Sequence, residues 1–287
     1  MRQVGWPWHG RGGAGVSHPS AIRIFLKTIV ARAYPRFVAA YRNRAWLITE
    51  TLLPLLGTIA MIYVYRALHA PARFLGFVVL GGVLLAFWQN VIWAMATQFF
   101  WDRGAGNLEL FAMAPTSLAA ILLGMALGGA YVSLTRAATI LLVASVLFGV
   151  SYSLSGLLPA LGVFVLTISA LYCLGMLLAS LFLFYQREAW QLADAMQEPI
   201  YFLSGFYFPV RSLGAVVGGI GSLIPLTLGL DAIRQLILPG TPQFIPLSVE
   251  VLAVVAQIIA YAALSQISLR YLERRARQDA RLILRST

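Results

Sequence analysis

Four polar residues recur at helical spacing in an otherwise apolar segment around residue 194. Arg187, Gln191, Asp194 and Glu198 fall at positions i, i+4, i+7 and i+11, so a helix carries them in one stripe. A carboxylate at membrane depth costs at least about 2.5 kcal/mol and usually faces a bundle interior or a wet cavity. Gln191, Asp194 and Glu198 are therefore candidates for lining a pathway or an interface. The alternative is a segment that starts in the lipid headgroup zone, where these residues are barely immersed.

A second candidate is the short segment from Gly106 to Pro115. Asn107 is a good helix N-cap, Glu109 lies in the first turn where the helix dipole favours a carboxylate, and Pro115 stops the helix. The predicted helix has about seven residues and is roughly 11 Å long, too short to cross a membrane. Apolar side chains lie around it: Leu108, Leu110, Phe111, Ala112 and Met113. Such a helix is expected either to dock into a partner's groove or to lie on lipid headgroups.

Several kinds of site are excluded by the residues that the chain lacks. Lys27 is the single lysine and no glycine-rich loop precedes it, so the chain carries no phosphate-binding loop for ATP. No His, Cys, Asp and Glu residues have metal-ligand spacing, and Cys173 stands alone. We therefore expect no catalytic residue, no cofactor and no metal on this chain, and a membrane enzyme is the weaker class.

The composition is that of a membrane protein. Hydrophobic residues make up 60% of the 287 residues, charged residues 11%, and the mean hydropathy is +0.81. A soluble domain carries roughly 25% charged residues. The net charge of +11 comes from arginines that cluster outside the apolar runs, as membrane orientation requires, so we expect lipid and not nucleic acid as a partner.

The apolar runs predict an all-α integral membrane fold with six transmembrane helices. Each run can supply the roughly 20 residues that a bilayer requires. A further apolar stretch, 213–238, is broken by glycines and Pro225, and we expect it to form re-entrant outer helices before the last span. The predicted spans are Trp46 to Tyr65, Phe74 to Trp101, Ser117 to Val150 as one long tilted helix with Arg136 inside it, Leu157 to Tyr185, Ala189 to Phe208 and Leu247 to Leu269.

Basic residues predict the orientation. With six spans, sixteen arginines and lysines lie on the side of both termini and four on the other side. This asymmetry places both termini in the cytoplasm and the chain in the inner (plasma) membrane. A seventh span would place the arginine-rich C-terminus outside, which disfavours it.

The segment before the first span predicts a different kind of helix. Apolar residues recur on one face, and Arg23 and Lys27 lie on the other, as in an amphipathic helix at the cytoplasmic interface. Pro35 is expected to bend or end it. The alternative is a simple membrane anchor. The predicted organisation is a disordered N-terminus (1–19), an interface helix (20–44), a six-span domain (45–270) and a basic cytoplasmic tail (271–287).

Three motifs resemble those of type-2 ABC transporter permeases. The run from Gly106 to Pro115 is similar to the family's coupling segment, with Asn107 where Thr is usual. Ser204-Gly205-Phe206-Tyr207-Phe208-Pro209 resembles the Ser-Gly-x-x-Phe-Pro signature. Pro225-Leu226-Thr227, with Arg234 downstream, resembles a Pro-Leu-Thr…Arg ending.

The resemblance implies a six-span permease that pairs with a second permease copy or paralogue and with separate ATPase subunits, which would hold the ATP and Mg²⁺. It assigns ATPase coupling to Gly106, Asn107, Leu108, Glu109, Leu110, Phe111 and Pro115. It also implies that the second and fifth spans line the dimer interface and the pathway, with Gln191, Asp194, Glu198, Ser204, Phe206 and Phe208 as pathway or interface residues. The expected activity is export of a drug, antibiotic or lipid-like substrate. The alternatives are a lipid-linked polysaccharide exporter and an ion-coupled secondary transporter.

Overall fold

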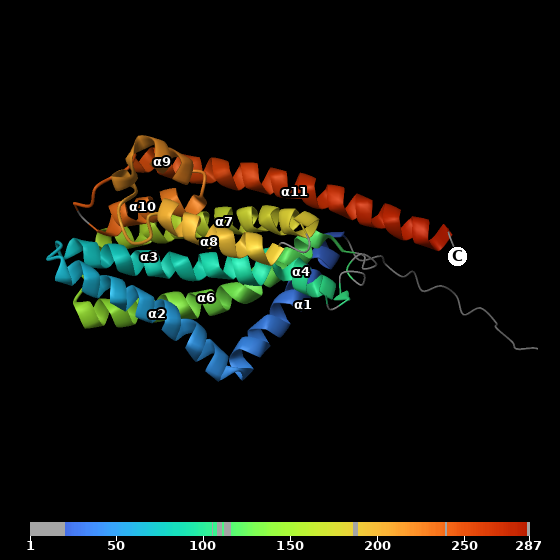
Figure 1. Cartoon of the computed structure of the whole chain (residues 1–287), viewed down its shortest axis with the longest axis horizontal. Coiled ribbons are helices and arrows are strands. Elements are labelled where there is room, and N and C mark those ends of the chain that lie inside the picture. The colour runs from blue at the N-terminus through green and yellow to red at the C-terminus, as the bar shows by residue number, and fades with distance from the viewer. Residues whose placement is uncertain are drawn as a thin grey trace, which may run out of the picture.

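The structure is a computed structural model that describes residues 21–104, 106–107, 111, 116–185, 189–238 and 240–285. Within these residues the regular elements are all helical (Figure 1). The predicted disordered stretch, 1–19, lies outside the described residues. The principal helices are α1 (Ala21–Arg42), α2 (Arg44–Ala67), α3 (Arg73–Gln89), α4 (Gln98–Gly104), α6 (Leu118–Phe148), α7 (Leu157–Tyr185), α8 (Ala189–Leu203), α9 (Gly214–Gly221), α10 (Pro225–Ile237) and α11 (Leu247–Arg285).

Five described helical segments are long and apolar enough to cross a membrane: Arg44–Ala67, Arg73–Asp102, Leu118–Phe148, Leu154–Leu183 and Leu247–Leu272. The stretch 117–150 is one helix, as predicted. The predicted fifth span corresponds to α8, which has 15 residues and is therefore about 22 Å long, shorter than a hydrocarbon core of roughly 30 Å. The count of six spans remains a prediction.

The second span is the centre of the bundle. It runs from α3 through a π-helical stretch, Asn90–Ala96, into α4. It is apolar on every side, and 89% of its most apolar window is buried inside the protein. Large side chains such as Phe77, Phe87 and Trp88 fill the interior between α3, α6, α7 and α10. A helix that is apolar all round is expected in such a central position.

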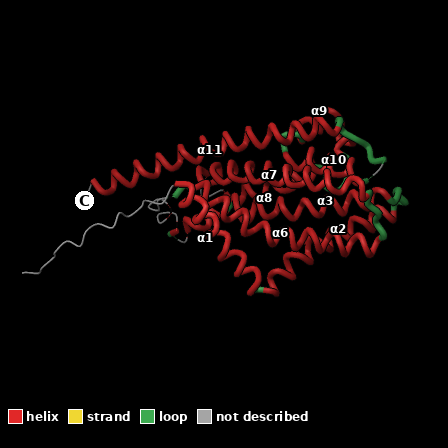
Figure 2. The backbone as a smooth tube through the Cα atoms, turned by 180° about the vertical axis from the view of Figure 1, so that it is seen from behind, coloured by secondary structure: helices red, strands yellow, loops and turns green. Residues whose placement is uncertain are grey.

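Helices α1 and α2 form a V that leaves the side of the bundle (Figures 1 and 2). The vertex is Asn43, whose side-chain oxygen accepts a hydrogen bond from the Trp46 backbone N–H at 3.1 Å and so caps α2. Helix α1 packs closely along α6, because Gly124 and Gly128 have no side chains there. It continues past Pro35 to Arg42, so the prediction that Pro35 could end this helix is wrong.

The two ends of the bundle differ (Figure 1). One end holds the α2–α3 turn, α9 and α10, and the other holds α4, the start of α1 and the far end of α11. The glycine-rich stretch forms two short helices of 8 and 13 residues, each too short to cross a bilayer, and its re-entrant placement remains a prediction. Helix α11 has 39 residues and continues through most of the predicted basic tail.

Candidate functional site

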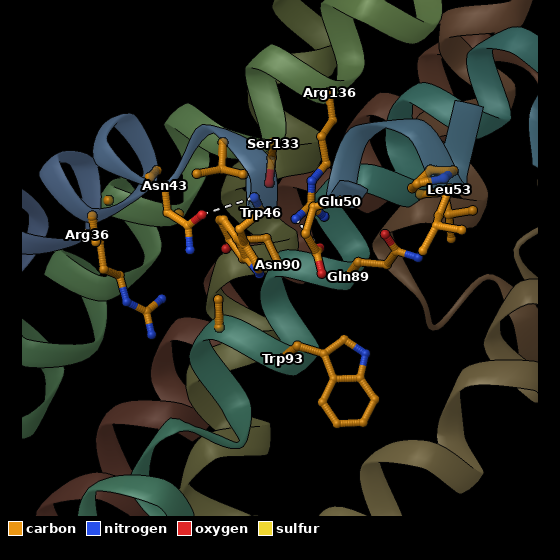
Figure 3. A pocket seen from close by; sticks show the side chains of 18 of the residues that line it. Arg36, Asn43, Trp46, Glu50, Leu53, Gln89, Asn90, Trp93, Ser133 and Arg136 are labelled. Atoms are coloured by element: carbon orange, nitrogen blue, oxygen red, sulfur yellow. Dashed lines mark hydrogen bonds and ion pairs between the residues drawn. The ribbon is translucent and has the colours of Figure 1, made fainter. Parts of the chain in front are cut away.

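A pocket of about 810 Å³ lies between α1, α2, the second span and α6 (Figure 3). Its lining includes Asn43 at the vertex of the V, and Tyr201 and Tyr207 from the region of α8 and the turn after it. The lining combines apolar and polar groups. Its polar and aromatic members are Arg36, Asn43, Trp46, Glu50, Gln89, Asn90, Trp93, Ser133, Arg136, Tyr201 and Tyr207.

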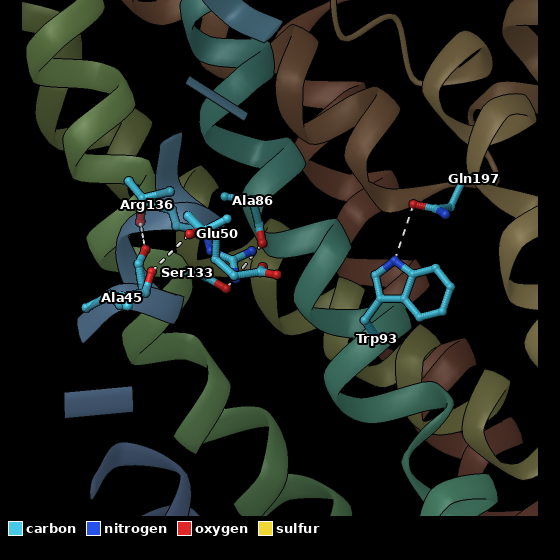
Figure 4. Close-up of polar contacts among 10 residues, drawn as sticks. Ala45, Glu50, Ala86, Trp93, Ser133, Arg136 and Gln197 are labelled. Atoms are coloured by element: carbon cyan, nitrogen blue, oxygen red, sulfur yellow. Dashed lines mark hydrogen bonds and ion pairs between the residues drawn. The ribbon is translucent and has the colours of Figure 1, made fainter. Parts of the chain in front are cut away.

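An ion pair crosses this pocket. Arg136 on α6 donates a hydrogen bond through its terminal nitrogen to a carboxylate oxygen of Glu50 on α2 (Figure 4). The Arg136 side chain is 7% exposed, whereas that of Glu50 is 40% exposed. Both residues lie inside candidate membrane spans. Ionisable residues at membrane depth are expensive, face cavities or partners, and typically mark a functional position.

The second span changes its helical geometry beside this ion pair. The π-helical stretch begins at Asn90, whose side-chain amide donates to the Tyr172 hydroxyl at 3.3 Å. One turn later the Trp93 ring N–H donates to Gln197 Oε1 at 3.3 Å (Figure 4). A π-helical turn adds a residue to the helix and is frequent at functional sites. Here it places Asn90 and Trp93 on the pocket wall.

Arg36 on α1 closes the end of the pocket nearest to α4. Its guanidinium donates to the side-chain oxygen of Gln98 and, at 3.4 Å, to the backbone oxygen of Met125. Burial lowers the pKa of Arg36 to about 10; the nearby Asp102 carboxylate acts against this shift and Arg32 adds to it. Arg36 therefore keeps its charge at neutral pH, and its hydrogen-bond acceptors are neutral.

The predicted coupling segment is only partly described. Leu108, Glu109, Leu110 and Pro115 lie outside the described residues. Gly106 has a φ of 73°, a left-handed conformation that suits glycine. The Asn107 side-chain amide donates to Asp102 at 3.3 Å, and the Arg32 guanidinium lies over the Phe111 ring, 4.4 Å from its centre.

Two further contacts tie this region to α1. Arg32 on α1 forms an ion pair with Asp102 at 3.4 Å, and the hydroxyl of Thr116 donates to that of Thr28 at 2.9 Å. Residues on both sides of the coupling segment, Asp102 before it and Thr116 after it, thus contact α1. The same helix carries Arg36 into the pocket, so α1 connects the two places physically.

The predicted polar stripe lies on a face of α8 that does not line the pocket. Gln191, Asp194 and Glu198 are all exposed, while Ala193 and Ile200 on the opposite face are buried. The three stripe residues therefore share one outward face, and none of them lines the pocket. Among the described residues neither carboxylate is in an ion pair, and Arg187 lies outside the described part of the chain.

The motif from Ser204 to Pro209 is mostly buried. Ser204 and Phe206 have no exposed surface, and Phe208 is partly exposed and packs against Phe202. Arg234, also fully buried, donates to the backbone oxygens of Gly205 at 2.8 Å and Phe206 at 2.7 Å. In this structure Ser204 and Phe206 belong to the protein interior and do not line the pocket.

Sequence reasoning missed Glu50 as a site residue and noted Arg136 only as an arginine inside a span. The signal was present, because each is an isolated charge within an apolar run. Their pairing was not predictable, since they are 86 positions apart and meet only when α2 packs on α6.

The sequence was compared with known protein families. Residues 26–238 match the ABC-2 type transporter family, whereas a search of curated proteins gave no significant match. The matched region contains the pocket, the start of the coupling segment, the Ser204–Pro209 motif and Arg234, and it covers well over half of the chain. This chain, with its several membrane-crossing helices, therefore belongs to the ABC-2 type transporters and is the multi-pass permease subunit of an ABC transporter.

Proposed function

We propose that the chain is the membrane half of an exporter that moves a hydrophobic or amphipathic substrate outward at the expense of ATP. The observation that carries this proposal is the pocket between the spans, with the Glu50–Arg136 ion pair on its wall. A volume of about 810 Å³ falls within the range of small-molecule sites, and mixed apolar and polar walls suit an amphipathic molecule.

The energy for transport would come from a separate ATPase chain, which holds the ATP and the Mg²⁺. The segment from Gly106 to Pro115 is the proposed docking element. Its support is physical: Asp102, before this segment, and Thr116, after it, contact Arg32 and Thr28 of α1. A displacement of the docked segment would then move α1, and with α1 the Arg36 side chain at the pocket.

A second permease, either a copy or a paralogue, is proposed to cover α8. The stripe of Gln191, Asp194 and Glu198 is exposed, and Trp190 and Phe202 on the same helix are 46% and 53% exposed. Large aromatic side chains mixed with polar groups are common in interfaces. In the pair, the stripe would face the partner or a shared pathway.

The proposed placement is the plasma membrane with six spans and both termini in the cytoplasm. In this arrangement α1 serves as the interface helix, α8 with Ser204–Pro209 completes the fifth span, and α9 and α10 form the re-entrant outer helices. The strong excess of arginine on the side of the termini supports it.

The test is reconstitution. The full chain would be co-expressed with a candidate ABC ATPase, purified as a complex and placed in proteoliposomes that contain fluorescent lipids and amphipathic dyes. We expect ATP-dependent movement of at least one probe, lost when the ATPase carries an inactive Walker site. Movement that follows an imposed ion gradient and ignores ATP would instead establish the ion-coupled secondary transporter.

A further inference from the structure

We infer that the pocket binds the phosphate-bearing, anionic head group of a lipid from the inner leaflet, with Arg136 as the main ligand and Glu50 as the counter-ion that the head group displaces. This inference rests on the proposed function, because it names the substrate class that the exporter would carry. It starts from hydrogen-bond donors that the protein itself leaves unused.

The spare donors belong to Arg136. A guanidinium has five N–H donors in a planar fork that matches phosphate and carboxylate oxygens. Arg136 directs one terminal nitrogen to Glu50, and its buried Nε has no partner within the described structure. A buried donor without a partner is unfavourable, and an added anion can satisfy it. The Glu50 side chain, by contrast, is 40% exposed, so the protein does not enclose it as it encloses Arg136.

The net charge of the residues that line the pocket also favours an anionic ligand. Two arginines, Arg36 and Arg136, line the pocket together with one carboxylate, Glu50. Arg36 has hydrogen bonds to the neutral Gln98 and Met125 oxygens, and in the described part of the chain it forms no ion pair. The three charged lining residues therefore carry a net charge of +1; the Asp102 carboxylate near Arg36 lies outside the lining and is paired with Arg32. An anionic ligand would balance this charge, whereas an organic cation would add a second one.

The surroundings suit a lipid more than a free anion. Apolar side chains such as Leu53, Pro54 and Leu85 stand beside the charged groups in the pocket wall. On the outer surface of α2, Ile48, Leu52 and Leu56 are 63%, 47% and 50% exposed, so apolar chains can lie against this helix. A head group at Arg136 would thus leave its acyl chains along α2, where the V of α1 and α2 leaves the bundle (Figure 1).

The helix that carries Glu50 is suited to such an exchange. Only 17% of the most apolar window of α2 is buried inside the protein, whereas the corresponding value for α6, which carries Arg136, is 61%. Arg136 is therefore held by the bundle, and Glu50 sits on the more loosely packed partner. We therefore expect Glu50, and not Arg136, to move when the ion pair separates.

Binding to the purified full chain tests the inference without need of an ATPase. The chain would be placed in phosphatidylcholine nanodiscs with a trace of photoreactive phosphatidylglycerol, or of photoreactive phosphatidylcholine with the same acyl chains. We expect preferential crosslinking of phosphatidylglycerol to peptides of α2 and α6. Excess unlabelled phosphatidylglycerol should compete, while inorganic phosphate at the same concentration should not. Competition by inorganic phosphate would show a site for the free anion and overturn the lipid assignment.

The variants separate recognition from folding. Arg136→Gln should lower the apparent affinity for phosphatidylglycerol by about tenfold or more and remove its preference over phosphatidylcholine. Glu50→Gln should raise that affinity, because it removes the competing carboxylate, whereas a purely structural ion pair predicts weaker binding in both variants. The double variant Arg136→Gln/Glu50→Gln leaves no buried charge unpaired and should still lack the preference. Arg66→Gln, an exposed arginine outside the pocket, is the control and should bind as wild type does.

The outcomes also separate this inference from the proposed function. Equal crosslinking of both lipids, together with ATP-dependent export of neutral or cationic amphiphiles, would overturn the anionic site and leave the exporter intact. Selective phosphatidylglycerol binding without ATP-dependent transport of any probe would support the site and count against the exporter. Weaker phosphatidylglycerol binding by Glu50→Gln would overturn the role of Glu50 as a displaced counter-ion.

Discussion

The Arg234 guanidinium donates a hydrogen bond to the backbone carbonyl oxygen of Phe206 at 2.7 Å, deep in the protein. The same guanidinium donates to the carbonyl oxygens of Gly205 and Phe77, each at 2.8 Å, and lies 3.6 Å from the centre of the Phe77 ring. One side chain thus joins the turn after α8 to the second span. This contact gives a structural reason for the Ser204–Pro209 motif and the downstream Arg234 to occur together in one chain.

We predict that Arg234→Met severely destabilises the protein. Methionine keeps much of the apolar stem but removes every donor, so three carbonyl oxygens each lose a hydrogen bond, at about 1–3 kcal/mol for an oxygen left without any partner. The expected result is a strong decrease in membrane abundance and in the thermal unfolding temperature in detergent. Arg211→Met, at an exposed arginine in the same end of the bundle, should behave as wild type. Equal stability of the two variants would contradict the structural role.

Gly81 provides a second test of the same junction. A methyl group added at Gly81 would overlap the backbone carbonyl oxygen of Phe206, so either the turn or α3 must shift. Overpacking of this kind costs typically about 1–3 kcal/mol. We expect Gly81→Ala to lower the unfolding temperature clearly. Gly57→Ala is the control, because a methyl group there meets open space and alanine favours a helix. A loss of stability in Gly57→Ala alone would contradict this packing.

The helical, membrane-spanning character could be predicted because hydropathy and arginine placement are local properties of the sequence. The end of α8 could not be predicted in the same way. The apolar pattern continues from Ala189 to Phe208, but the chain turns at Gly205, whose φ is 61°. The turn is held by hydrogen bonds from Arg234 to its carbonyl oxygens, and hydrophobic periodicity does not contain this contact across 29 positions.

In the candidate site, too, the local features could be predicted from the sequence and the contacts between helices could not. The stripe on α8 was predictable from its spacing, and the structure places Gln191, Asp194 and Glu198 on one outward face. The pocket could not be predicted, because the charged residues that line it come from different helices. Glu50 and Arg136 each stand out as charges in apolar runs, yet only the packing of α2 on α6 makes them an ion pair.

Phe111→Asp is expected to weaken the interaction with the ATPase and to reduce transport without unfolding the chain. Phe111 belongs to the coupling segment. Its side chain is partly buried, and the guanidinium of Arg32 on α1 lies over its ring. A carboxylate there would be poorly solvated against an apolar groove. Co-purification of the ATPase and ATP-dependent transport are the measurements, and membrane abundance is the check on folding. Leu110→Asp should act in the same direction. If both variants bound the ATPase and transported normally, the segment would be a surface turn only.

The orientation predicts how single cysteines react. In a Cys173→Ser background, Ser286→Cys should react with a membrane-impermeant maleimide only after cells are permeabilised, because the basic C-terminal region is expected in the cytoplasm. Ser153→Cys lies at the opposite end of the bundle, between α6 and α7, and should react from outside. Labelling of Ser286→Cys in intact cells would contradict six spans.

Neutralising the stripe on α8 should change transport and leave folding intact. Asp194 and Glu198 are exposed, so Asp194→Asn and Glu198→Gln remove charge without opening a cavity or leaving a buried group unpaired. If the stripe faces the pathway, the field at the substrate becomes less negative, and transport should slow severalfold for a cationic probe while an anionic probe is unaffected or faster. Glu273→Gln, in the predicted basic tail, is the matched control. Rates in proteoliposomes for both probes provide the measurement. Wild-type rates for both probes in both stripe variants would place the stripe in the headgroup zone, whereas equal slowing of both probes would indicate a damaged subunit interface.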